Sequence, residues 1–151
     1  MKKPRGISQE EFETKFCFKK QNVELHEYKM HKMIYNAKVI RVPKIYSYDK
    51  HTKMMIMEKI PNMSISDYYG ENASDVPVHI MNQIQDEITK LYYYGVYYPD
   101  ITGYNFILHN NNIHVIDFEH SIFYTKKSIE INPYVHEFMN GLCKWNEEEF
   151  A

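Results

Sequence analysis

The chain has 151 residues, which is enough for one domain with a single hydrophobic core. A hydrophobic content of 44% together with 25% charged residues excludes an intrinsically disordered protein. The formal net charge of -2 argues against a dedicated nucleic-acid-binding protein, because such proteins are normally basic.

The sequence also argues against a membrane or secreted protein. No segment approaches the roughly 18 consecutive apolar residues of a membrane-spanning helix, and residues 1–15 contain no apolar stretch of a secretory signal. Cys17 and Cys143 lie far apart and form no metal or redox motif, and the 8 histidines form no ligand-like pair. We therefore expect a cytoplasmic protein with reduced thiols.

Strands and one helix are predicted in the first sixty residues. The polar residues 1–15 are expected to fray or to form a short helix. The run FCFKK at 16–20 is apolar and β-prone, which predicts a strand, and apolar residues at helical spacing predict a helix over 23–36. Residues 44–49 and 54–60 flank a polar turn and predict an antiparallel hairpin.

Helices are predicted to dominate the rest of the chain. A short helix is expected at 64–69, and a longer one over 76–94, where apolar residues recur at steps of three and four before Gly95. The last helix is expected over 133–143. Three short β-prone segments lie before it: 96–98, 106–108 and 114–118. Strands early in the chain and helices later predict an α+β fold.

The most informative segment is YYPDITGYNFILHNNNIHVIDFEH at 97–120. Asn105 and Asp117 offer oxygens of the kind that Mg²⁺ prefers. Asp100, in the same loop as Asn105, can accept a hydroxyl proton or orient a nucleophile. Each of these residues taken alone is more typical of a turn or a cap. The prediction of a catalytic site therefore depends on their combination and spacing.

This segment resembles the catalytic core of the protein-kinase-like superfamily. DITGYN is similar to the Asp-x-x-x-x-Asn of the kinase catalytic loop, and DFE is similar to the Asp-Phe-Gly metal motif. The resemblance implies that Asp100 is the catalytic residue, that Asn105 and Asp117 bind Mg²⁺, and that ATP is the nucleotide.

Upstream segments resemble the nucleotide-binding lobe of the same superfamily. MMIMEKIP is similar to the strand that leads into the hinge between the lobes. The resemblance places Met57 at the gatekeeper position. It places Glu58, Lys59 and Ile60 in the hinge, whose backbone binds adenine in the family.

The resemblance also implies a lysine that anchors the nucleotide and a glutamate that pairs with it. FCFKK is similar to the strand that carries the lysine, and Glu27 is placed like the glutamate. In the family the lysine follows a small residue by two positions on one face of the strand, and Cys17 and Lys19 fit that spacing. This favours Lys19, with Lys20 pointing away, and Lys20 is the alternative.

Several features depart from an ordinary protein kinase. No Gly-x-Gly-x-x-Gly loop is present, and Tyr98-Pro99 stands where His-Arg usually precedes the catalytic Asp. Glu119 replaces the Gly of the metal motif, a form associated with choline-kinase-like and aminoglycoside-phosphotransferase-like members. Only about 30 residues follow Glu119. The resemblance, which covers residues 16–120, is therefore to a minimised atypical member.

The resemblance implies one reduced kinase-like domain, with a small N-terminal sheet lobe over about 1–60 and a truncated helical lobe over about 61–151. The first hypothesis for its function is an ATP- and Mg²⁺-dependent phosphotransferase that acts on a protein Ser/Thr or a small-molecule hydroxyl. The alternative is a catalytically weak or inactive pseudokinase-type module that binds and regulates a partner protein. Neither hypothesis involves a membrane or a nucleic acid.

Overall fold

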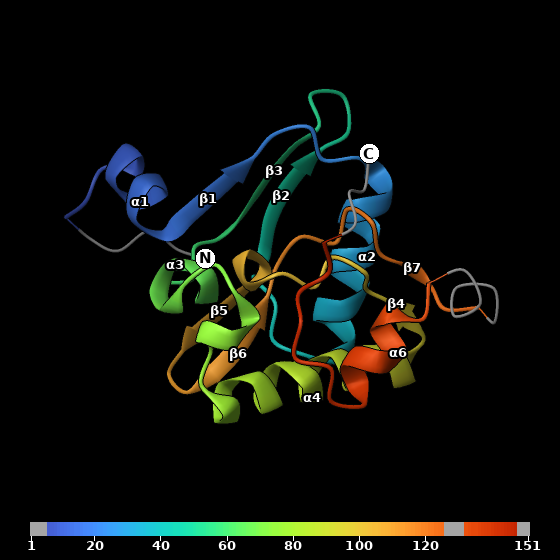
Figure 1. Cartoon of the computed structure of the whole chain (residues 1–151). Helices are drawn as coiled ribbons and strands as arrows, with labels where there is room; N and C mark the ends of the chain where they lie inside the picture. Colours follow the sequence, from blue (N-terminus) through green and yellow to red (C-terminus); the bar gives the residue numbers. More distant parts are fainter. Residues whose placement is uncertain (1–5, 126–131, 148–151) are drawn as a thin grey trace.

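The computed structural model describes residues 6–125 and 132–147, and it has two lobes, a small antiparallel sheet and a larger helical part (Figure 1). Its elements in chain order are α1 (Gln9–Phe16), β1 (Cys17–Lys20), α2 (Leu25–Ala37), β2 (Ile45–Asp49), β3 (Met54–Glu58), α3 (Ile65–Tyr69), η1 (Ala73–Asp75), α4 (Val78–Tyr94), β4 (Val96–Tyr97), η2 (Gly103–Asn105), β5 (Phe106–His109), β6 (Asn112–Val115), β7 (Ile122–Phe123) and α6 (Tyr134–Met139). The α+β class and the kinase-like arrangement predicted from the sequence are confirmed.

The small lobe is a three-stranded sheet in the order β1-β3-β2, with both pairs antiparallel. Its central strand β3 alternates between partly exposed and buried side chains, as expected for a sheet with one covered face. Met55 and Met57 of β3 pack with Val23 in a small core of their own. The predicted hairpin between β2 and β3 is therefore confirmed.

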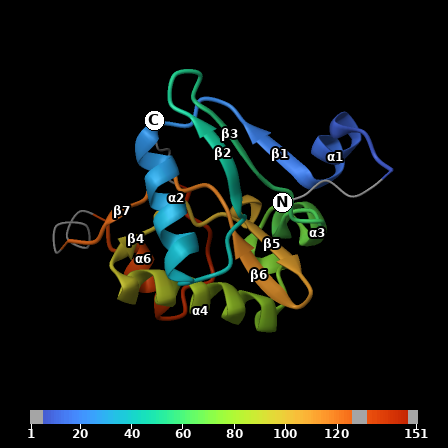
Figure 2. The ribbon, with the colours of Figure 1, turned by 180° about the vertical axis from the view of Figure 1, so that it is seen from behind.

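The large lobe is built around α4, which has 17 residues. Its apolar stripe is buried, as the spacing predicted: Ile80, Ile84, Ile88 and Leu91. Met30 and Ile34 of α2 join the same core, whereas Tyr28 of α2 packs against the small core. Helix α2 therefore belongs to both lobes and connects them (Figure 2). None of the helices in the described ranges is both long enough and apolar enough to span a bilayer.

Two short antiparallel ladders fix the segment 97–120, which resembles the kinase catalytic core. The hairpin β5-β6 lies between Asn105 and Asp117, and β4 pairs with β7 on the other side of the motif. The Ile116 N–H also donates to Asn105 O at 3.0 Å, which ties the end of the hairpin to its beginning. The loop and the metal motif are thus fixed to each other by backbone hydrogen bonds.

The boundaries of several elements differ from the predictions. The α4 helix ends before Gly95 as predicted, with φ 109° there, but it begins at Val78 with Pro77 as its N-cap and not at residue 76. The predicted strand over 114–118 is wrong at its end. Strand β6 stops at Val115, since Asp117 adopts a left-handed backbone with φ 66° that no strand accommodates. The short strand β7 was not predicted.

Candidate active site

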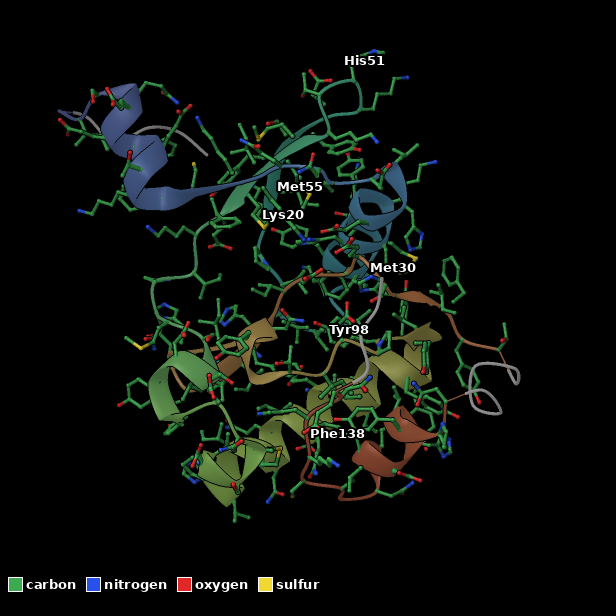
Figure 3. All side chains as sticks on the ribbon, turned by 45° about the horizontal axis from the view of Figure 1, so that its top comes forward. Lys20, Met30, His51, Met55, Tyr98 and Phe138 are labelled. Atoms are coloured by element: carbon green, nitrogen blue, oxygen red, sulfur yellow. The ribbon has the colours of Figure 1, made fainter. Side chains whose placement is uncertain are left out.

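A cavity of about 330 Å³ lies between the two lobes. Residues of both lobes line it: Phe18, Lys20, Glu27, His31, Pro43, Met57, Glu58, Lys59, Ile60, Asn62, Asn105, Ile107, Ile116 and Asp117. Figure 3 labels Lys20 on the sheet side and Tyr98 on the helical side. A larger cavity of about 680 Å³ opens beside the loop after α2, and of the predicted site residues it includes only Glu58. The interlobe cavity therefore contains most of the predicted site.

Lys20 is the lysine that enters this cavity. Its Nζ lies 2.6 Å from Glu27 Oε2 and 3.4 Å from Asp117 Oδ1. The Glu27 side chain is only 3% exposed, and burial raises the pKa of its carboxyl although the Lys20 ammonium opposes that shift. Burial disfavours the charge on Lys20, yet the two carboxylates outweigh it and raise the pKa of Lys20. The ammonium is thus held charged between the two acids.

Lys19 lies outside the cavity, which corrects the preference for this residue as the anchor. Its Nζ pairs with Glu13 Oε2 at 3.1 Å, on the side of the strand that faces α1. The prediction that alternate residues of this strand share a face is correct. The wrong one of the two faces was expected to meet the cavity. Phe18 and Lys20 face the cavity, whereas Cys17 and Lys19 face the other way.

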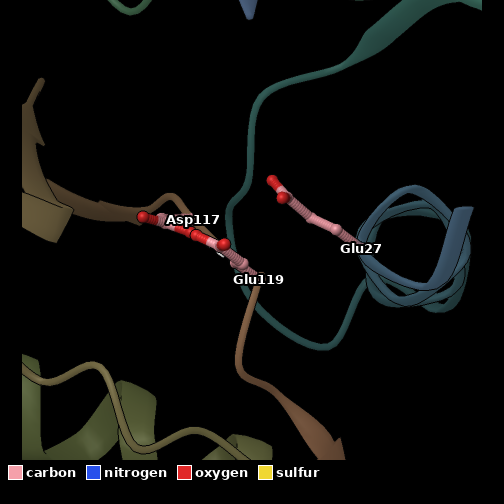
Figure 4. Close-up of side chains that lie close together, drawn as sticks. All are labelled: Glu27, Asp117 and Glu119. Atoms are coloured by element: carbon pink, nitrogen blue, oxygen red, sulfur yellow. Dashed lines mark hydrogen bonds between the residues drawn. The ribbon is translucent and has the colours of Figure 1, made fainter. Parts of the chain in front are cut away.

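Asp117 and two glutamates form an acidic cluster. One ligand oxygen from each of Glu27, Asp117 and Glu119 lies within 4.8 Å of the others. Figure 4 shows these carboxylates reaching a common space from α2 and from the segment after β6. The Glu119 N–H donates to Asp117 Oδ1 at 3.2 Å, which orients the Asp117 carboxylate. Hard carboxylate oxygens in this number suit a divalent cation such as Mg²⁺.

Asn105 is oriented by the loop that contains Asp100. Its Nδ2 donates to Asp100 O at 2.9 Å, and its own N–H donates to Thr102 O at 3.0 Å. Because the amide nitrogen is occupied in this way, the side-chain oxygen is the atom left for a cation. Asn105 and Asp117 both line the interlobe cavity, so the predicted metal ligands lie in one place.

Asp100 lies beside the cavity and not in its lining. Its side chain is 11% exposed, and its Oδ2 is 2.6 Å from His120 Nδ1. Burial raises the pKa of the Asp100 carboxyl, and His120 only partly offsets that shift. Asp117 and Glu119 add to it, because their negative charges disfavour a further carboxylate nearby. A carboxyl with a raised pKa is suited to accept a proton.

The predicted hinge also lines the cavity. Met57, Glu58, Lys59 and Ile60 all contribute to its wall. The Glu58 N–H donates to Lys44 O at 2.8 Å, and the Lys59 N–H donates to Phe16 O at 2.9 Å. These bonds tie the predicted hinge to the sheet lobe, because Phe16 directly precedes β1 and Lys44 directly precedes β2.

The model of the RIO domain family matches residues 8–131, which is most of the chain. The chain belongs to the RIO family. RIO proteins are atypical members of the protein-kinase-like superfamily, so the resemblance carried by DITGYN and DFE is confirmed. At the family level, a RIO domain implies a kinase-like, ATP-binding phosphotransferase.

Two residues of the candidate site, His120 and Glu119, were not predicted from the sequence. His120 was treated only as one of several scattered histidines, yet its ring contacts the predicted catalytic residue. Glu119 was noted as a departure from the motif and not as a partner of Glu27 and Asp117. Both residues come directly after Asp-Phe, where the chain must turn to form β7. This position is the sequence signal that could have identified them.

The substitution Gly103→Ala is expected to destabilise the catalytic loop. A Cβ at this buried position would lie 2.1 Å from Ser66 Oγ and 3.1 Å from both Ser66 Cβ and Trp145 Cζ2. We expect a loss of about 1–3 kcal/mol in the free energy of unfolding, as for an overpacked core. Urea denaturation measures this loss.

The matched control for that prediction is Gly103→Ala in a Ser66→Ala background. Ser66 Oγ makes no hydrogen bond within the described residues, so its removal should cost little stability. The Gly103→Ala loss should shrink in this background because the closest clash is gone. An equal loss in both backgrounds would contradict the steric explanation.

Proposed function

We propose that this RIO domain is an ATP- and Mg²⁺-dependent phosphotransferase whose acceptor is a hydroxyl group of a protein Ser/Thr or of a small molecule. The observation that carries the proposal is the contact of Lys20 with both Glu27 and Asp117 in the cavity that the hinge also lines. An ammonium, a metal-binding carboxylate and an apolar slot for a base are the parts that nucleotide binding requires.

Each side chain has a role in the proposed reaction. Lys20 binds the phosphates of ATP, and Glu27 holds the ammonium in place. The hinge binds adenine through the Ile60 N–H, for which the described residues provide no hydrogen-bond acceptor, whereas the neighbouring Glu58 and Lys59 amides already donate to backbone carbonyls. The residues also fit a metal, and Asn105 and Asp117 would hold it. The chemistry supplied by a bound Mg²⁺ is neutralisation of phosphate charge.

Asp100 positions the acceptor hydroxyl and takes its proton. Its raised pKa supports this role, because a more basic carboxylate accepts a proton more readily. Catalysis by these residues consists of orientation and charge stabilisation, which is the usual mode in phosphoryl transfer.

A thermal-shift assay with ATP tests the binding half of the proposal. With Mg²⁺ and ATP at a hundred times the dissociation constant, mass action adds about 2.7 kcal/mol to stability. For a chain of this size that corresponds to a rise in Tm of roughly 5 to 10 °C. Omission of Mg²⁺ should remove most of this rise.

Lys20→Met and Lys19→Met form a matched pair for the same assay. Lys20→Met should abolish the ATP-dependent shift, because the phosphates lose their ammonium. Lys19→Met should keep the shift, since Lys19 pairs with Glu13 away from the cavity. Equal shifts in the two variants would refute Lys20 as the anchor.

One observation favours the alternative of a regulatory pseudokinase-type module. In the part of the chain that the structure describes, α1 leads directly into β1, and no glycine-rich hairpin precedes that strand. A module of this kind would bind a partner protein and would show little or no transfer. Turnover of ATP by the pure protein distinguishes the two functions.

A further inference from the structure

We infer that His120 is a positioning residue, which holds the Asp100 carboxylate in the orientation needed for phosphoryl transfer. This inference rests on the proposed function. His120 Nδ1 lies 2.6 Å from Asp100 Oδ2, a short contact that indicates a direct hydrogen bond between the ring and the carboxylate. The Asp100 side chain is 11% exposed and the His120 side chain 27%, so the contact is partly shielded from water.

The sheet topology brings these two residues together. Strands β4 and β7 pair antiparallel, with Tyr97 opposite Ile122 at one end of the ladder. From that end the chain continues forward to Asp100 and backward to His120. Asp100 and His120, which are twenty positions apart in the sequence, therefore both lie just beyond the same end of the β4-β7 ladder.

The backbone around His120 is held independently of its ring. The Ser121 N–H donates to Phe118 O at 3.1 Å, which closes a tight turn after the metal motif. His26 Nε2 on α2 lies 2.6 Å from Ser121 O and donates to it. The turn that carries His120 therefore has two backbone contacts of its own besides the contact of the ring with Asp100.

The bonding pattern defines that role at the level of atoms. An ionised carboxylate only accepts hydrogen bonds, so His120 Nδ1 carries the proton that is shared with Asp100 Oδ2. Asn105 Nδ2 meanwhile binds the backbone carbonyl of Asp100. Fixed at two points, Asp100 presents its other oxygen, Oδ1, to the acceptor hydroxyl.

The transfer step balances with ATP and an acceptor hydroxyl as the reactants. The acceptor oxygen forms a bond to the γ-phosphorus while the bond from that phosphorus to the β,γ-bridging oxygen breaks, and its electron pair leaves with ADP. The acceptor proton passes to Asp100 Oδ1. His120 keeps its own proton and prevents the carboxylate from rotating away.

Two substitutions of His120 separate positioning from packing. His120→Leu removes the donor and should lower kcat for ATP turnover roughly ten- to a hundredfold, with little change in the KM for ATP. His120→Asn places an amide nitrogen near the Nδ1 position and should restore kcat to within about threefold of the wild type. His79→Asn, an exposed substitution on α4, is the matched control and should leave kcat unchanged.

A second measurement reads the hydrogen bond without any turnover. In protein labelled with ¹⁵N-histidine, the neutral ring of His120 should carry its proton on Nδ1, because Asp100 accepts from that atom. In Asp100→Ala this preference should disappear, whereas the signals of His79 should not change.

The outcomes distinguish this inference from the proposed function. Background turnover by the wild-type protein would overturn the proposed phosphotransferase and with it the catalytic use of the pair. With turnover present, equal losses in His120→Leu and His120→Asn would overturn the positioning role. A neutral His120 ring protonated on Nε2 in the wild type would overturn the hydrogen bond itself.

Discussion

Asp117→Asn is expected to abolish the Mg²⁺-dependent binding of ATP. The substitution removes one negative charge from the acidic cluster while it keeps the size of the side chain. Asparagine also tolerates the left-handed backbone at this position, so the local fold should survive. The loss should therefore appear in nucleotide affinity, with ATP turnover falling to background.

Asp100→Asn is expected to give a different phenotype. The metal ligands stay in place, so ATP affinity should remain within a few-fold of the wild type. Phosphoryl transfer should fall by about 10²–10⁴-fold, because the group that accepts the hydroxyl proton is gone. Isothermal titration and ATP turnover, measured on the same preparations, separate the two effects.

The contrast between these variants tests the proposed enzyme directly. A regulatory module that binds its partner at the surface predicts neither phenotype. Measurable wild-type turnover that both substitutions leave unchanged would contradict the assignment of both residues. The control is Asp67→Asn, an exposed residue near the start of α3, which should alter neither property.

Much of the fold was accessible from the sequence because its strongest signals are periodic. The apolar stripe of α4 and the hairpin of β2 and β3 depend on spacing alone, and both are present. The short strands were harder, since two-residue ladders such as β4-β7 are formed by tertiary pairing and not by local preference. The two-lobe division near residue 60 remains a prediction.

The structure brings most, but not all, of the predicted site residues into one cavity. Asn105 and Asp117 fall into one cavity because a β-hairpin joins them, and each of its strands overlaps a segment that was predicted to be β-prone. The choice between Lys19 and Lys20 depended on which face of a four-residue strand meets the cavity. Which face meets the cavity depends on β1 beginning directly after α1. No local sequence pattern encodes that starting point.

His31 is expected to make the protein sensitive to acid. The side chain is 1% exposed, and its Nε2 lies 2.7 Å from Pro43 O, to which the neutral ring donates. Its ring also packs against Phe118 of the metal motif at a centroid distance of 5.2 Å. Burial lowers the pKa of His31 from 6.5 to about 4, and the nearby Lys20 ammonium acts in the same direction.

The direction of the pH effect follows from this lowered pKa. Between pH 6.5 and about 4 the unfolded chain binds a proton at His31 that the folded chain does not bind. The contribution of His31 to stability is therefore complete above pH 6.5 and is lost as the pH falls toward 4. The full loss amounts to about 3 kcal/mol of the free energy of unfolding.

His31→Gln should remove this part of the acid sensitivity. The glutamine amide can still donate to Pro43 O, but it does not titrate, so a moderate loss of stability at neutral pH should come with a flatter acid profile. Urea denaturation at several values between pH 7 and pH 4 measures the difference from the wild type. His79→Gln, at an exposed position, should keep the wild-type profile. If His31→Gln instead lost stability with acid as steeply as the wild type, His31 would not be the source of the acid sensitivity.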